Sequence, residues 1–367
     1  MTSSEKKIII FTAILMAVYF VVATPKMNDD GFHYEGFTES LARGTIDFKS
    51  FYGFQGLSIF SVPVFWLTGS HISIIITSML FSILSIPLVY LAGRDFYKSQ
   101  KGGIYFLVLF LLTPYPYTTL MRGFQESALL FFLLLIIYSA VNKRLWTPVA
   151  WAVGGIVKPF ALVLFPLFAK DFGERKKWLW VFVGLFIGGL YLGASYYQTG
   201  HLVNNAAIGS YQGNFNAGNP PPLTESFVLG PKGFLRVGAN LLLHFRKIMI
   251  SPLVIILGAL ALLLNKNLRL RKEIILAAVL NFILVGSLSF SFPKYLLPMT
   301  VLFALASVHY LLKYHWLMWL VFIDSFFVFL FLWNYFGFHY WQNIWIYLIP
   351  FWAAIALYLF GKREKFV

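Results

Sequence analysis

Long apolar stretches separated by short polar segments extend through the chain from end to end. Runs of this length predict transmembrane helices, because a helix satisfies the backbone N–H and C=O groups of a span within the span itself. The apolar residues are continuous and do not alternate, which excludes the strands of a membrane β-barrel. We therefore predict an all-α polytopic membrane protein with about twelve segments, at residues 8–24, 71–93, 102–116, 126–142, 146–158, 160–170, 178–198, 248–264, 273–291, 296–312, 316–335 and 343–361.

Three apolar stretches are shorter than a comfortable span. The segments at 146–158 and 160–170 fit either a re-entrant pair or helices that continue beyond the bilayer. Residues 57–68 lie between Gly56 and Gly69, and counting them as a span would reverse the charge asymmetry of every later loop. We therefore expect residues 57–68 to form a helix that lies in the outer membrane interface.

Charge supports the membrane class and gives an orientation. Charged residues make up 12% of the chain, whereas a soluble domain has about 25%. The net charge of +15 comes largely from lysines and arginines in short loops between spans, where they set orientation, so a nucleic-acid partner is not expected. Basic loops alternate with loops poor in positive charge. We expect a plasma-membrane protein with both termini in the cytoplasm and with residues 25–70 and 200–246 outside.

The sequence gives little indication of a disulfide, a reactive thiol or a metal site. The chain has no cysteine, which excludes a disulfide framework, a thiol nucleophile and a cysteine metal site. The histidines show no ligand spacing, and no further acids for a divalent-metal site can be placed. We therefore expect no cofactor, and a divalent metal is not favoured.

Acidic residues concentrate directly after the first segment. Four of the 14 acids in the chain lie within eleven positions, at Asp29, Asp30, Glu35 and Glu39. Charge at a membrane boundary is costly to keep dry, so this cluster indicates a functional site. Tyr34, Phe37 and Leu41 share one helical face, Glu35 and Glu39 lie on another, polar face, and Gly44 follows. This pattern predicts an amphipathic interfacial helix that ends at Gly44.

Several short motifs occur in a fixed order, at residues 28–30, 42–44, 52–56, 113–116, 122–126, 154–160 and 292–298. Their order resembles the GT-C glycosyltransferases, polytopic enzymes that use polyprenyl-phosphate sugars, with the protein-O-mannosyltransferase and aminoarabinose-transferase branches nearest in pattern. Two departures are the missing prolines after Gly53 and a lysine, Lys294, where the family has arginine. The resemblance implies a catalytic membrane module over residues 1–170 and a variable membrane module over 171–367.

The resemblance implies transfer of a hexose or pentose, with inversion, from a polyprenyl-phosphate donor to a hydroxyl of a glycan, lipid or protein acceptor. By position, the catalytic acid of the family maps to Asp29 or Asp30, and a second acid maps to Glu126. A carboxylate at the membrane boundary can take the proton of the acceptor hydroxyl, and a neighbouring acid raises its pKa. Both acids at 29 and 30 can alternatively cap the helix that follows.

The departing polyprenyl phosphate needs cations and N–H donors. Candidate substrate-binding residues are Arg122, Lys158, Lys294, Tyr295, Arg246 and Lys247, together with His33 and Tyr34 beside the acidic pair. Lys158 has no acid near it along the chain until Asp171, so the donor phosphate is its expected counter-ion. The alternatives are that Lys158 extends to the membrane interface and that Glu126 pairs with Arg122 one turn earlier.

Two other function classes remain open. A membrane polysaccharide polymerase or ligase has a similar size but relies on outer arginines and histidines. A lipid or sugar transporter (a flippase) often has internal repeats and broken helices at the midplane, and no convincing repeat is present. Asp324, inside the segment 316–335, is expected either to have a buried partner or to line a cavity wall, with a role closer to structure than to catalysis.

Overall fold

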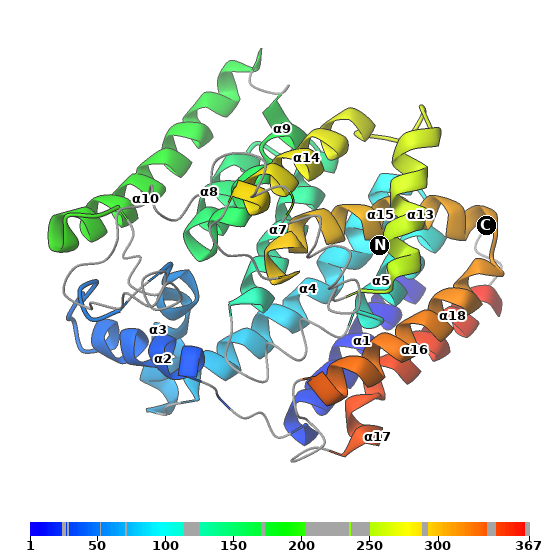
Figure 1. Cartoon of the computed structure of the whole chain (residues 1–367), viewed down its shortest axis with the longest axis horizontal. Helices are drawn as coiled ribbons and strands as arrows, with labels where there is room; N and C mark the ends of the chain where they lie inside the picture. Colours follow the sequence, from blue (N-terminus) through cyan, green and yellow to red (C-terminus); the bar gives the residue numbers. More distant parts are fainter. Residues whose placement is uncertain are drawn as a thin grey trace.

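A computed structural model of the chain describes residues 1–23, 27, 29–51, 53–69, 72–113, 125–169, 173–202, 235, 250–287, 293–335 and 343–363. Every regular element in these residues is a helix (Figure 1). The elements are α1 (Ser3–Val22), α2 (Asp29–Ala42), α3 (Gly56–Thr68), α4 (Ser73–Tyr97), α5 (Gln100–Leu111), α7 (Glu126–Val141), α8 (Thr147–Val157), η1 (Pro159–Leu164), α9 (Pro166–Ala169), α10 (Arg175–Thr199), α13 (Pro252–Leu264), α14 (Arg271–Ser287), η4 (Pro293–Leu296), α15 (Leu297–Lys313), α16 (Leu317–Tyr335), α17 (Ile344–Tyr347) and α18 (Ile349–Arg363).

The predicted segments correspond to these helices in the same order. Three of the helices, α4, α10 and α16, are long and apolar enough to cross a membrane by length and composition, and several shorter apolar helices accompany them. With this pattern the chain is an integral, multi-pass membrane protein. The helix expected at 57–68 is present as α3 and has Gly69 in the left-handed conformation as its C-cap, with φ +56°.

Two segments differ from the expected single helices. The described part of the segment expected at 160–170 forms the 3₁₀-helix η1 and the single turn α9, because Pro159 follows Lys158 and removes a backbone donor at the end of α8. Pro166 ends η1 in the same way. The last segment is divided at Leu348 into α17 and α18.

The bundle is built around α4, α5 and α7. Helix α4 packs along both α5 and α7, α1 packs on α4, and α18 packs on α5. Helix α15 packs against both α5 and α13. Its close approach to α13 requires a glycine at position 258, because an added Cβ there would lie 2.2 Å from the carbonyl oxygen of Phe303 in α15. One continuous cluster of buried apolar side chains connects these helices.

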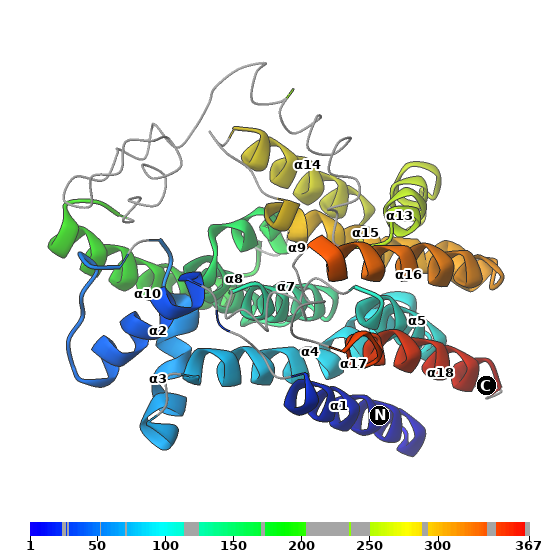
Figure 2. The same cartoon turned by 60° about the horizontal axis from the view of Figure 1, so that its bottom comes forward.

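The two ends of the bundle differ in character. Helices α2 and α3 lie at one end, whereas the N- and C-termini lie toward the opposite end (Figures 1 and 2). At the end with the termini, Arg269 donates to the carbonyl oxygens of Asp95, at 2.8 Å, and of Val141. These carbonyls belong to the C-terminal turns of α4 and α7, so Arg269 stabilises two helix ends at once.

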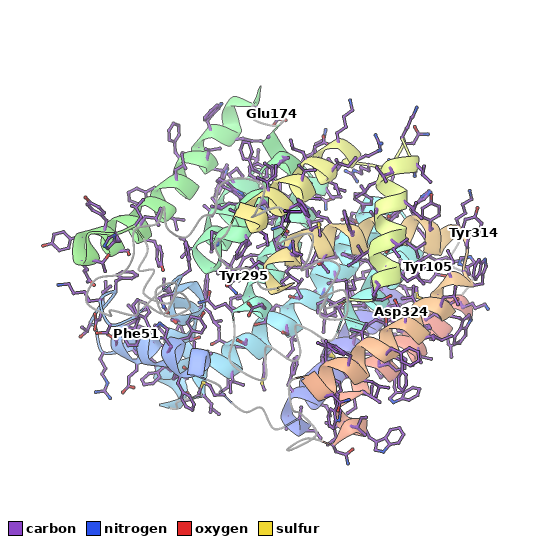
Figure 3. The ribbon with its side chains drawn as sticks, viewed as in Figure 1. Phe51, Tyr105, Glu174, Tyr295, Tyr314 and Asp324 are labelled. Carbon is purple, nitrogen blue, oxygen red and sulfur yellow. The ribbon has the colours of Figure 1, made fainter. Side chains whose placement is uncertain are left out.

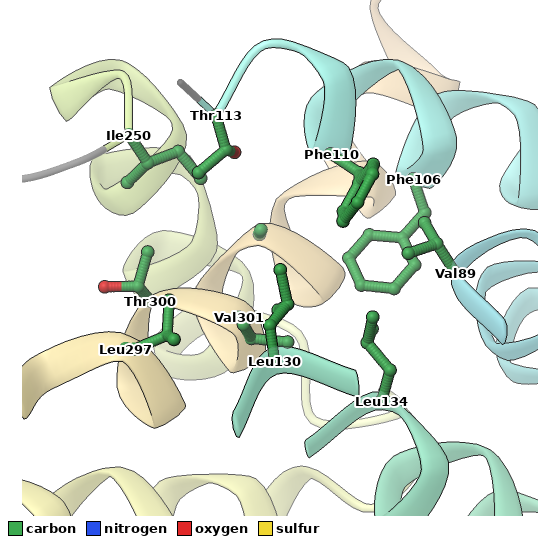
Figure 4. A pocket seen from close by; sticks show the side chains of 11 residues that line it. Val89, Phe106, Phe110, Thr113, Leu130, Leu134, Ile250, Leu297, Thr300 and Val301 are labelled. Carbon is green, nitrogen blue, oxygen red and sulfur yellow. The ribbon is translucent and has the colours of Figure 1, made fainter. Parts of the chain in front are cut away.

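A cavity of about 30 Å³ lies among α4, α5, α7 and α15 (Figure 4). Its lining is apolar apart from Thr113 and Thr300, and each hydroxyl donates to the carbonyl four residues earlier, those of Leu109 and Leu296. This volume has space for only about two water molecules. The cavity is therefore a packing gap of the core and too small for a sugar or a prenyl chain.

Candidate active site

Helix α2 begins with the acidic pair itself, which corrects the expected order of acids first and helix second. Asp29 and Asp30 are the first two residues of α2, where negative charge interacts favourably with the helix dipole. The helix ends as predicted: Gly44 has φ +82°, its N–H donates to the carbonyl of Leu41, and the N–H of Thr45 donates to the carbonyl of Ser40. The side chains of the acidic pair lie outside the described part.

Glu35 fixes α2 against the start of α4. Its carboxylate accepts hydrogen bonds from Ser73 Oγ at 2.7 Å and from the Ile74 N–H at 3.0 Å. Glu35 is only 3% exposed, so it does not belong to a solvated polar face of the helix. This contact anchors the acidic helix to the first long membrane helix, because the carboxylate satisfies N-terminal donors of α4.

The segment 53–56 connects α2 to two other helix ends. Gly56 packs directly on α8, since an added Cβ would lie 2.5 Å from Val157 Cα. The buried Gln55 places its amide nitrogen 3.3 Å from His33 Nε2, and its backbone N–H donates to Tyr191 Oη at 2.8 Å. The side-chain amide of Gln125, directly before α7, donates to the carbonyl of Phe54. The α2 helix, the start of α7 and the end of α8 therefore meet at this segment.

Glu126 and Lys158 form an ion pair at this junction. Glu126 is the first residue of α7, and Lys158 follows the last residue of α8. The side chain of Glu126 is fully buried and that of Lys158 is 13% exposed. The expectation that Lys158 has no acid near it is therefore wrong, because the partner is close in space although 32 residues away along the chain.

Tyr295 completes the group around Lys158. The Lys158 Nζ atom lies 5.8 Å from the centroid of the Tyr295 ring, within the range of a cation–π contact. Tyr295 also stacks on Phe160, with ring centroids 4.6 Å apart. Figure 3 labels Tyr295 near the middle of the bundle and Phe51 at the α2 end. The 292–298 motif thus approaches the 154–160 motif, as motifs of one site should.

The candidate residues divide into two groups. His33, Glu126, Lys158 and Tyr295 are brought to one junction. Tyr34 contributes its backbone carbonyl, which accepts from Ser58 Oγ at 2.9 Å. Outside the described residues lie Arg122, Arg246 and Lys247, and outside the described side chains lies Lys294.

Sequence reasoning missed Gln55 and Gln125, which connect the junction. Both lie in motifs that the sequence analysis singled out, at 52–56 and 122–126, although neither glutamine was assigned a role there. Asp324 lies elsewhere in the bundle (Figure 3): it accepts from Ser251 Oγ and from the Leu253 N–H, capping α13. Of the two expected alternatives, the structure shows the buried partner, because Ser251 is 0% exposed. No group of three His, Asp or Glu residues in the described part of the chain is placed to hold a metal ion.

Comparison with known proteins identifies the fold. No protein-family model matches the sequence, and a search of curated proteins finds no match either. Two solved structures of ArnT from Cupriavidus metallidurans, one bound to undecaprenyl phosphate and one in the apo state, are similar to this chain, with TM-scores of 0.59 and 0.56. Their sequence identities are 15% and 13%, and each alignment covers 98% of this chain and 76% of ArnT. The chain therefore has the fold of ArnT along nearly its whole length.

Proposed function

We propose that this protein transfers a sugar from a polyprenyl-phosphate donor to a hydroxyl acceptor on the extracytoplasmic side of the membrane. The observation that carries the proposal is the meeting of the acidic α2 helix with the Glu126–Lys158 pair at segment 53–56. This junction lies in a chain with the fold of ArnT, and one ArnT structure is described as bound to undecaprenyl phosphate.

The acidic pair supplies the base of the reaction. Asp29 and Asp30 open α2, one turn before His33, which reaches the junction through Gln55. An ionised carboxylate at this position takes the proton of the acceptor hydroxyl while the hydroxyl oxygen attacks C1 of the sugar, with inversion at that carbon. The bond from C1 to the phosphate oxygen breaks in the same step, and the leaving group is the polyprenyl phosphate.

The cation of the junction assists departure of the phosphate. Lys158 lies at the end of α8, and its ammonium has three N–H donors. Lys158 is paired with Glu126, and one N–H suffices for that contact, so the remaining N–H groups can donate to a phosphate. A donor phosphate beside Tyr295 would receive a charge-assisted hydrogen bond from Lys158 as negative charge develops. Lys294 belongs to the same turn as Tyr295 and is a second candidate for this role.

The test is turnover by the purified protein. Incubation in detergent with a panel of polyprenyl-phosphate sugars, followed by mass spectrometry, should show loss of one donor and release of polyprenyl phosphate. Asp29→Asn or Asp30→Asn should lower turnover by about 100-fold or more, as expected for a lost general base. Asp47→Asn is the matched control, because Asp47 lies in the same expected outer segment and its carboxylate accepts from the nearby backbone N–H groups of Lys49 and Ser50.

Other function classes give different results in this assay. A transporter would move the lipid-linked sugar across a vesicle membrane without breaking the bond to phosphate. A polymerase or ligase would require a preassembled glycan. Full activity of both amide variants would refute the assignment of the base to the acidic pair.

A further inference from the structure

Asn281 is a buried amide in the middle of the apolar helix α14, and both ends of its side chain are bonded. It is 0% exposed. Its Nδ2 donates to the carbonyl oxygen of Tyr295 at 3.1 Å, and its Oδ1 accepts from the N–H of Met299 at 3.2 Å. A fully buried amide costs free energy when it has no hydrogen-bond partners. The two bonds of Asn281 therefore explain why this position tolerates a polar side chain.

The two bonds hold one turn of backbone. Tyr295 is in the 3₁₀-helix η4, and Met299 is in the first turn of α15. The first N–H groups of a helix have no partner within the helix, and Asn281 supplies one for α15. The same side chain fixes the carbonyl of Tyr295, so the backbone on both sides of the η4–α15 boundary is held from α14.

The held turn carries the ring that faces Lys158. Tyr295 stacks on Phe160 at 4.6 Å between centroids, and Lys158 Nζ lies 5.8 Å from the Tyr295 ring. The ammonium group is in turn paired with Glu126. Contacts therefore run without interruption from Asn281 through Tyr295 to Lys158.

We propose that Asn281 is a positioning residue of the donor-phosphate site: it fixes Tyr295, and the Tyr295 ring together with Phe160 fixes the head group of Lys158. This inference rests on the proposed function, because it assigns the phosphate to Lys158. It adds a residue from α14, which lies in the second half of the chain, to a site otherwise built mainly from the first 170 residues.

The experiment measures binding of undecaprenyl phosphate to the detergent-purified full chain. Asn281→Ala should weaken binding by about 10-fold, the effect of one lost hydrogen bond of moderate strength transmitted to the site. The matched control is Asp324→Ala, which removes an acceptor of the Leu253 N–H and of the N-cap residue Ser251 at the start of α13, at a different place in the bundle. This control should retain wild-type affinity although it also loses an acceptor at the start of a helix.

A double-mutant cycle separates positioning from capping alone. In a Tyr295→Leu background, Asn281→Ala should cause no further loss of affinity, because its effect passes through the ring. An equal loss in both backgrounds would overturn the inference, as would wild-type affinity of Asn281→Ala.

Two further results keep the test decisive. If Asn281→Ala does not fold, Asn281→Leu is used, which nearly keeps the side-chain volume but removes both the donor to Tyr295 and the acceptor for Met299. Its affinity should be lowered by the same factor, and wild-type affinity of this variant would contradict the inference. Absence of binding by the wild-type protein would count against the proposed function itself, which distinguishes the two failures.

Discussion

Removing the charge of Lys158 should destabilise the protein because it leaves a buried carboxylate without its cation. Glu126 is fully buried and the Lys158 side chain is 13% exposed, so neither group is screened well by water. Breaking a buried ion pair from one side costs about 3–5 kcal/mol. We expect Lys158→Met to lower the free energy of unfolding by about this amount, and Glu126→Gln to have a similar effect.

The double variant Glu126→Gln/Lys158→Met should lose less stability than either single variant, because no isolated charge remains. Denaturation by SDS titration in mixed micelles measures the free energies, and the coupling should reach about 3 kcal/mol. Additive losses in the double variant would refute the buried ion pair. Binding of undecaprenyl phosphate separates stability from function: Lys158→Met should bind about 10- to 100-fold more weakly, whereas Glu126→Gln keeps the ammonium and should still bind.

Three further predictions concern other parts of the chain. Glu35→Ala removes the acceptor at the start of α4 and should lower stability by about 1–2 kcal/mol in the same titration, and no change would contradict the capping role. Asp324→Ala should cost about 1 kcal/mol while turnover per folded molecule stays at the wild-type level. In the cysteine-free chain, a cysteine at Ser210 should react with an impermeant thiol reagent from outside and one at Ser99 only from the cytoplasm, and the reverse pattern would invert the predicted topology.

The helices could be predicted because a lipid bilayer places a simple physical requirement on every segment that crosses it. A span must be apolar and helical over its whole length, so the start of α7 at Glu126 and the helix α3 between Gly56 and Gly69 could be derived from the pattern of apolar residues. Helix ends that are followed by a glycine in the left-handed backbone conformation, such as the end of α2 before Gly44, could also be predicted.

The connections of the site were not predictable by the same rule. Glu35 was assigned to a polar helix face, yet it is buried against α4. The spacing of hydrophobic residues in α2 shows which face of the helix is apolar. It does not show that a carboxylate on another face can be buried when it accepts hydrogen bonds at the start of a second helix. Only the packing of α2 against α4 reveals the difference. Asn281 is a similar case, since its partners lie 14 and 18 positions away along the chain.

The Glu126–Lys158 pair was not predicted, but unlike the contacts of Glu35 and Asn281 it could have been, because the information for it was present in the sequence. Helices α7 and α8 are joined by a short turn and pack against each other, so they form a helical hairpin. In such a hairpin, residues at similar distances from the turn lie at the same level. Glu126 opens α7 and Lys158 follows the last residue of α8, so the hairpin brings the two ends together. A search for an anion along the chain near Lys158 could not find this partner, whereas a search across the hairpin would have. Lysines at the ends of membrane helices should therefore be matched first with acids at the facing end of the neighbouring helix, and only then with a ligand.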